Sequence, residues 1–164
     1  MPIVQGRTAA DLMRRTLVFA RPDQKISEAE QLLVDKHISG MPVIDGSKLV
    51  GIVSGSDLAR AHVLAAALDG QIRDELHWDE TQADGFRHSD PERFKGFSER
   101  YDALRVKDVM RTQVVTCPST APIKDVAALM VQQHIHRVIV VDRDRPVGII
   151  SSLDLARLLA ETAA

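Results

Sequence analysis

Four stretches in the first half of the chain carry a clear pattern of hydrophobic and polar positions. Apolar residues recur at helical spacing in "SEAEQLLVDKH" (27–37), where Ser27 followed by Glu30 predicts a capping box. Two β-rich runs flank an Asp-Gly turn in "MPVIDGSKLVGIVS" (41–54). A short apolar run, "TLVF" (16–19), precedes these stretches, and "SDLARAHVLAAAL" (56–68) follows them. The pattern predicts a strand, a helix, two strands and a closing helix.

The second half of the chain repeats this pattern. A shift of 97 positions aligns residues 10–60 with 107–157 without a gap, and 19 of the 51 aligned pairs are identical. "GIVSGSDLAR" (51–60) returns as "GIISSLDLAR" (148–157) with seven identities in ten positions. The predicted first strand of this copy is "QVVT" (113–116), and Val126, Leu129 and Met130 form the apolar face of its first helix. Two strands follow in "RVIVVDRDRPVGIIS" (137–151), and the closing helix is "LDLARLLAETAA" (153–164).

A unit of about 50 residues has a thin core, so two copies packed face to face would cover each other's sheets. The sequence therefore predicts an α/β (α+β) fold of two βαββα units packed as a pseudo-two-fold pair.

Composition and charge exclude some classes of function for this protein. The net charge of −2 and the lack of Lys/Arg clusters argue against nucleic-acid binding. No apolar run approaches the length of a membrane span, and "MPIVQGRTAADLMRR" lacks a signal-peptide core, so we expect a cytoplasmic protein with no membrane contact. Cys117 is the only cysteine and is expected to be a small buried hydrophobe.

Catalytic motifs are missing from the sequence. Ile52 occupies the position where a G-x-S-x-G elbow needs its first Gly, and no Walker, G-x-G-x-x-G or Cys/His metal spacing occurs. We therefore expect no catalytic residues and no metal. His37 and His134 recur at equivalent positions, just after the predicted first helix of each copy. We expect them to lie at helix C-termini and not to bind a metal.

The repeated motifs resemble a tandem pair of CBS domains, named after the regulatory region of cystathionine β-synthase. The features that carry the resemblance are "DLM" and "DVM", "MPVID" and "VIVVD", and G-h-x-S-x-x-D in each copy. On this basis residues 8–61 form the first domain, 62–105 an insert and 106–160 the second domain. The resemblance implies clefts for adenosine-containing ligands and a homodimer of two pairs.

Ribose and phosphate contacts are predicted at the turn from the last strand to the closing helix. Ser54 and Asp57 in the first copy, and Ser151 and Asp154 in the second, bring a hydroxyl, a carboxylate and helix N–H groups together. The same residues also fit a plain helix cap.

The resemblance places the adenine against the first strand and the segment before the second strand. The candidate residues are Thr16, Val18, Ile38, Met41 and Pro42 in the first copy, and Gln113, Val115, Ile135, Val138 and Ile139 in the second. Packing in the core is an equal alternative for the apolar ones, and Ile139 stands where the first copy has Pro42. His136 and Arg137 are candidate phosphate ligands, or else a solvated pair in a loop.

The insert holds five aromatic residues, which a plain flexible linker would lack: Trp78, Phe86, Phe94, Phe97 and Tyr101. They are expected to pack on the module, a second subunit or a partner. His77, Asp79, Glu80, His88 and Asp90 fit a solvated acidic loop better than a metal site.

Two functions remain open at this point. The first is a non-catalytic sensor that binds AMP, ADP, ATP, NAD or S-adenosylmethionine and signals to a separate, unidentified partner. The second is an interaction module with degenerate clefts that grips its partner through the insert.

Overall fold

The computed structural model describes residues 6–68 and 99–160, and side chains throughout these ranges except at 64–68. These residues fall into two compact units. One unit contains the described residues of Met1–Phe19, Pro42–Ile52 and Arg111–Ala164, and the other contains those of Ala20–Met41 and Val53–Met110.

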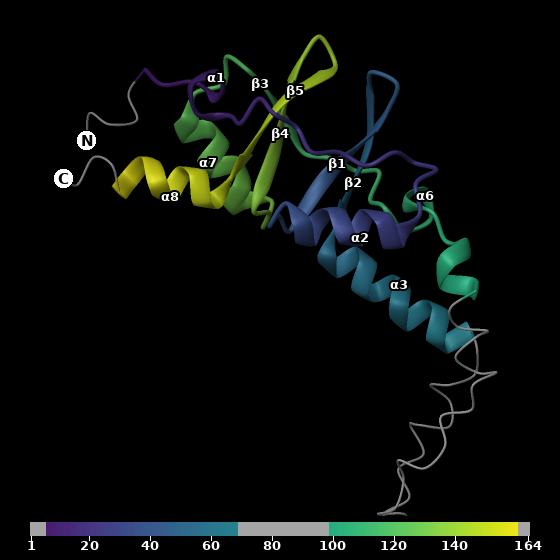
Figure 1. Cartoon of the computed structure of the whole chain (residues 1–164). Helices are drawn as coiled ribbons and strands as arrows, with labels where there is room; N and C mark the ends of the chain where they lie inside the picture. Colours follow the sequence, from purple (N-terminus) through teal and green to yellow (C-terminus); the bar gives the residue numbers. More distant parts are fainter. Residues whose placement is uncertain (1–5, 69–98, 161–164) are drawn as a thin grey trace, which may run out of the picture. The chain divides into compact units, whose positions relative to one another are not determined.

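The first unit is built on a three-stranded sheet in the order β3-β4-β5. β3 (Thr116–Pro118) runs parallel to β4 (Arg137–Asp142), which pairs antiparallel with β5 (Arg145–Ser151). Helices α7 (Ile123–Gln132) and α8 (Ser152–Ala160) pack beside this sheet (Figure 1). The predicted order of strand, helix, two strands and helix is therefore confirmed in the second copy.

The core of this unit is apolar and continuous. Buried side chains from the sheet, from one face of α7 and from α8 meet side chains of the chain's N-terminal segment: Ala9, Met13, Cys117, Ile123, Val126, Met130, Val138, Val140, Ile150 and Leu158. The expectation that Cys117 is a buried small hydrophobe is confirmed.

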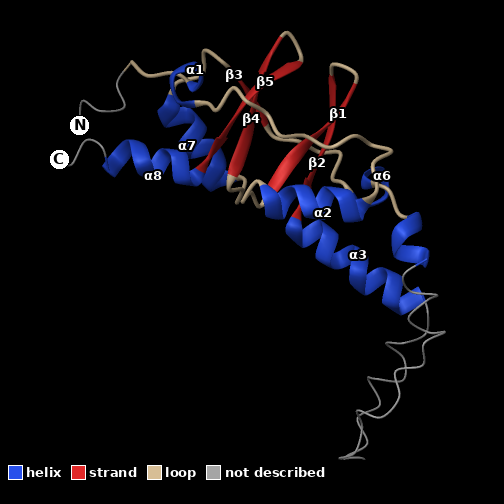
Figure 2. Cartoon of the chain, in the orientation of Figure 1, coloured by secondary structure: helices blue, strands red, loops and turns tan. Residues whose placement is uncertain are grey.

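The first copy supplies a hairpin and two helices (Figure 2). β1 (Gly40–Asp45) and β2 (Lys48–Ser54) pair as a two-stranded sheet, preceded by α2 (Ile26–Asp35) and followed by α3 (Gly55–Leu68). The strand predicted at 16–19 is wrong, because this stretch makes no ladder. The strand predicted at 113–116 begins only at Thr116. Apolar β-branched residues fit a pleated surface, but a strand also needs a partner that local sequence does not specify.

The capping box predicted for Ser27 and Glu30 is also wrong. The helix begins at Ile26, two residues too early for Ser27 to be its N-cap, and no side chain caps it. The N–H of Ile26 donates instead to the carbonyl of Leu104 at 3.4 Å. A main-chain carbonyl from far along the sequence thus satisfies one of the free main-chain donors in the first turn of this helix.

Each copy exchanges its leading segment with the other. These leading segments, residues 8–14 and 105–111, include the short helices α1 (Ala9–Leu12) and α6 (Val106–Val109). The main-chain bonds that hold them repeat with the sequence offset: Ala9 N to Ala121 O and Arg14 N to Ile149 O, matched by Val106 N to Gln24 O and Arg111 N to Ile52 O, all 2.8–2.9 Å. Residues at the start of each copy therefore complete the fold of the other.

The first leading segment approaches β5 closely at Gly148. A Cβ added to Gly148 would lie 2.5–2.9 Å from the Sδ, Cγ and Cβ atoms of Met13. Gly148, part of the repeated G-h-x-S-x-x-D motif, thus leaves the space that Met13 fills.

Candidate functional site

The second copy of the Ser-Asp motif forms a compact turn between β5 and α8. Oδ2 of Asp154 accepts hydrogen bonds from the main-chain N–H of Ser151, at 2.8 Å, and from its hydroxyl. The N–H of Asp154 donates back to Oγ of Ser151 at 3.3 Å. The residues expected to touch a ribose thus form a helix cap in this structure, and Asp154 is only 7% exposed.

Arg14, from the exchanged leading segment, holds the other oxygen of this carboxylate. Its Nε and Nη2 donate to Oδ1 of Asp154 at 3.0 and 2.8 Å. Arg157 adds a weaker ion pair at 3.7 Å. Burial alone raises the pKa of Asp154, but the hydrogen bonds from Ser151 and the charge and bonds of Arg14 outweigh it and leave the pKa below its usual value. The sequence analysis missed Arg14, although the repeat aligns it with Arg111.

The first copy builds the same turn between β2 and α3. Oδ2 of Asp57 accepts from the N–H of Ser54 at 3.0 Å and from the Ser54 hydroxyl, and Arg60 donates to Oδ1 at 3.0 Å. Asp57 is 3% exposed. Both carboxylates are thus buried hydrogen-bond acceptors at the N-terminus of a helix, where the helix dipole favours negative charge.

Arg137, a candidate phosphate ligand, lies beside the Ser-Asp motif of its own copy. In the β4–β5 ladder it is the direct partner of Ser151, and the carbonyl of its neighbour His136 accepts from Ser152 N at 3.0 Å. Arg137 is half-buried, and this burial lowers the pKa of its guanidinium. The ordinary pKa of arginine is so high that the side chain still carries its positive charge. His136 is exposed. A guanidinium and a carboxylate of opposite charge therefore share this end of the hairpin.

The candidate adenine residues differ widely in burial. Thr16 and Gln113 are exposed, whereas Val18, Ile38, Val115 and Ile135 are half-buried. Met41, Pro42, Val138 and Ile139 are buried, and Val138 belongs to the core of the first unit. Core packing is therefore established for Val138.

His37 and His134 lie just beyond the C-termini of α2 and α7, as predicted, at positive φ of 50° and 51°. Histidine tolerates this left-handed backbone better than most residues, which gives a conformational reason for its recurrence. Across residues 6–68 and 99–160 no cluster of three potential metal ligands occurs. His77, Asp79, Glu80, His88 and Asp90 lie outside the described residues.

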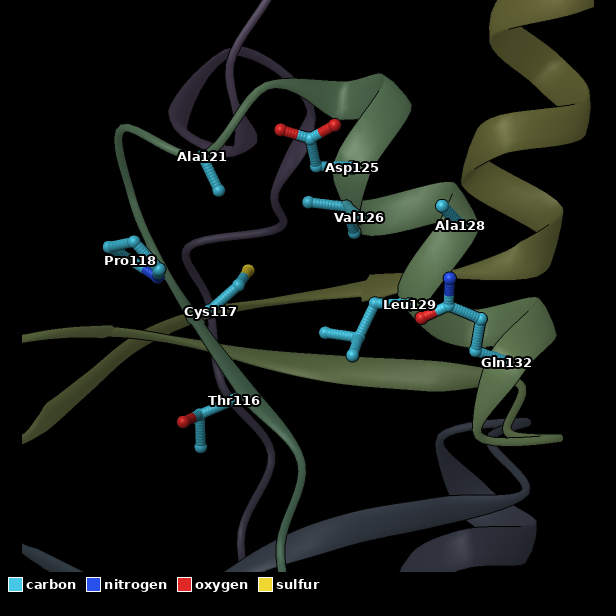
Figure 3. A pocket seen from close by; sticks show the side chains of 9 residues that line it. All are labelled: Thr116, Cys117, Pro118, Ala121, Asp125, Val126, Ala128, Leu129 and Gln132. Atoms are coloured by element: carbon cyan, nitrogen blue, oxygen red, sulfur yellow. The ribbon is translucent and has the colours of Figure 1, made fainter.

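A separate pocket of about 420 Å³ opens between β3 and α7. Cys117 and Leu129 point toward each other across it, with Thr116, Asp125 and Gln132 at its edges (Figure 3). None of the predicted ligand residues lines it. Burial raises the pKa of the Cys117 thiol, which makes it a poor nucleophile.

One aromatic of the insert packs on the first copy. Tyr101 is 8% exposed, its hydroxyl donates to Glu30 on α2 at 2.8 Å, and its ring stacks on His62 of α3 with centroids 4.1 Å apart. His62 also approaches Glu30 at 3.4 Å. The expected packing is therefore confirmed for Tyr101, while Trp78, Phe86, Phe94 and Phe97 lie outside the described residues.

Comparison with known proteins agrees with this architecture. The family model of the CBS domain matches residues 9–63 and 106–161. The chain therefore belongs to the CBS domain family and contains two copies of the domain. Its described helices include none that is long and apolar enough to cross a bilayer.

Similar proteins include CBSX2 of Arabidopsis thaliana, a chloroplastic CBS domain-containing protein, which is 28% identical over 156 residues, covering 93% of this chain and 63% of that protein. Protein YhcV of Bacillus subtilis is 25% identical over 89% of this chain and 81% of its own length. Protein MJ1232 of Methanocaldococcus jannaschii is 26% identical over 85% of this chain, which spans only 35% of it.

Among solved structures, CBSX2 in complex with AMP has a TM-score of 0.68 and 26% identity, covering 97% of this chain and 100% of that one. The CBS domain pair of protein MJ0100, solved with 5'-methylthioadenosine and S-adenosyl-L-methionine, has a TM-score of 0.66 and 23% identity, with 95% and 98% coverage. The second likeness supports the fold alone.

Proposed function

We propose that this protein is a non-catalytic sensor that binds adenosine-containing nucleotides at its two Ser-Asp motifs and passes the signal to a separate partner. The observation that carries the proposal is a buried carboxylate, hydrogen-bonded to the serine of its motif, at the same strand-to-helix turn in both copies: Asp57 and Asp154. The likeness to CBSX2, which was solved in complex with AMP, extends over 97% of this chain and supports the proposal.

The chemistry of this turn suits a nucleotide. An ionised carboxylate accepts hydrogen bonds from ribose hydroxyls, and the first N–H groups of α3 and α8 suit an anion. Arg137, in register with Ser151, supplies a fixed positive charge for a phosphate in the second copy. The first copy has Gly40 at this position, so we propose unequal affinities.

Calorimetric titration with AMP, ATP, NAD and S-adenosylmethionine tests the proposal. Asp57→Ala and Asp154→Ala should each weaken one site about ten- to hundred-fold, because each removes a charged hydrogen-bond acceptor. Asp45→Ala is the matched control, since Asp45 also recurs in both copies, as Asp142, but at the far end of the hairpin. Silence from all four ligands would favour the interaction module instead.

A further inference from the structure

The carboxylate of Asp154 has no acceptor site left for a ligand in this structure. A carboxylate offers about four lone-pair directions. Ser151 takes two on Oδ2 through its N–H and hydroxyl, and Arg14 takes two on Oδ1 through Nε and Nη2. A ribose diol that donates both protons to Asp154 therefore needs one of these partners to leave.

Arg14 is the partner that can leave at least cost. The bonds from Ser151 close the turn that caps α8, so losing them would disturb the local backbone. The side chain of Arg14 is 50% exposed, so its guanidinium can return to water after only a small movement. Its backbone is fixed separately, since Arg14 and Ile149 exchange main-chain hydrogen bonds of 2.9 and 3.1 Å.

We propose, building on the proposed function, that Arg14 competes with the ribose for Oδ1 of Asp154 and so sets the affinity of the second motif. A nucleoside binds there by displacing this guanidinium. Because Arg14 belongs to the exchanged leading segment, ligand binding at the end of the second copy releases a side chain from the start of the first.

The test measures adenosine and AMP binding by calorimetry on chains that all carry Asp57→Ala. This substitution weakens the first site, so the measured binding is that of the second motif. Arg14→Ala should tighten adenosine binding about ten-fold, because the ribose then no longer has to break a charged hydrogen-bonded contact before it binds. Arg14→Lys, which keeps the charge but not the two-pronged contact, should give an intermediate gain. Arg157→Ala is the control, since Arg157 pairs with the same oxygen only at 3.7 Å and should change affinity about two-fold or less.

The outcomes separate the two proposals. Tighter binding by Arg14→Ala supports competition, and so does binding that appears only in that variant. Unchanged or weaker binding overturns the role of Arg14 while leaving the sensor intact, since the Asp57→Ala parent still binds. No heat from any chain overturns both proposals, because no ribose is then present to displace Arg14.

Discussion

Single side chains decide how the insert joins the first copy. Tyr101 donates to Glu30 from a buried position, and both burial and the negative charge of Glu30 raise the pKa of the Tyr101 phenol well above its ordinary value. The phenol is therefore held neutral by the folded state. His62, stacked on its ring, adds contact area to the same cluster.

Tyr101→Phe should lower the free energy of unfolding by about 1 kcal/mol at pH 7, because a hydrogen bond to a half-exposed carboxylate is lost. A group with a raised pKa in the folded state stabilises fully below its unfolded pKa of about 10, and this contribution is lost as the pH rises further. The advantage of the wild type over Tyr101→Phe should therefore shrink above pH 10. Urea denaturation from pH 7 to 11 measures it, and parallel curves for the two proteins would contradict the assignment.

Arg137 should discriminate between charged and uncharged ligands. An uncharged adenosine makes no use of its guanidinium, whereas a phosphate can accept two bonds from it. Arg137→Ala should therefore weaken AMP about ten- to hundred-fold and leave adenosine nearly unchanged, with calorimetry as the measurement. An equal loss for both ligands would mean that Arg137 supports the hairpin rather than the phosphate.

Sequence reasoning was strong for residues whose role is local and weak for those whose partners are distant. The Ser-Asp turn was found because its spacing recurs within four residues. Arg14 was missed, because its contact with Asp154 joins residues 140 positions apart. The core position of Val138 was left open for a similar reason, since an apolar residue looks the same facing a core or a ligand.

At the scale of the element, the leading segments were also hard to place from the sequence, because their partners are distant along the chain. The repeat predicted both hairpins and the four longer helices, since their periodicity is local. It did not predict which copy each leading segment joins, because the two copies offer nearly the same surface.

Gly148→Ala should destabilise the protein by about 1–3 kcal/mol, because the new methyl group overlaps Met13 and pushes the first leading segment away from β5. Gly55→Ala is the matched control. Gly55 is the first residue of α3 and lies within the first copy of the motif, and a Cβ there meets nothing within 4 Å. Thermal denaturation of both variants gives the comparison, and similar melting temperatures would contradict the close packing of Gly148.

At the scale of the whole molecule, we predict that two chains associate. Not every apolar residue of the helices suits such a contact, since Leu58 on α3 is only 1% exposed. Leu159 is 58% exposed, and Val34 and Val131, equivalent positions on α2 and α7, are 62% and 74% exposed. Equivalent exposed valines on both copies are a suitable basis for a symmetric contact.

Light scattering at micromolar concentration should give twice the 18.1 kDa of one chain. Introducing Val34→Glu and Val131→Glu together should yield monomers, because two charges would be buried at the contact. Gln132→Glu adds a charge at an exposed neighbouring position and should leave the mass unchanged. A wild-type mass of a single chain would contradict the prediction.

The exchange of leading segments also governs how this chain folds as it leaves the ribosome. Residues 8–14 emerge well before their hydrogen-bond partners, which are at 121 and 149. A nascent first copy likewise waits for residues 105–111 before the start of α2 and the end of β2 find their partners. Contacts this distant slow folding, and neither half closes its core alone. We therefore expect the two copies to reach their native state together, only after the second copy has emerged, although each carries almost the whole pattern of a domain in its own sequence.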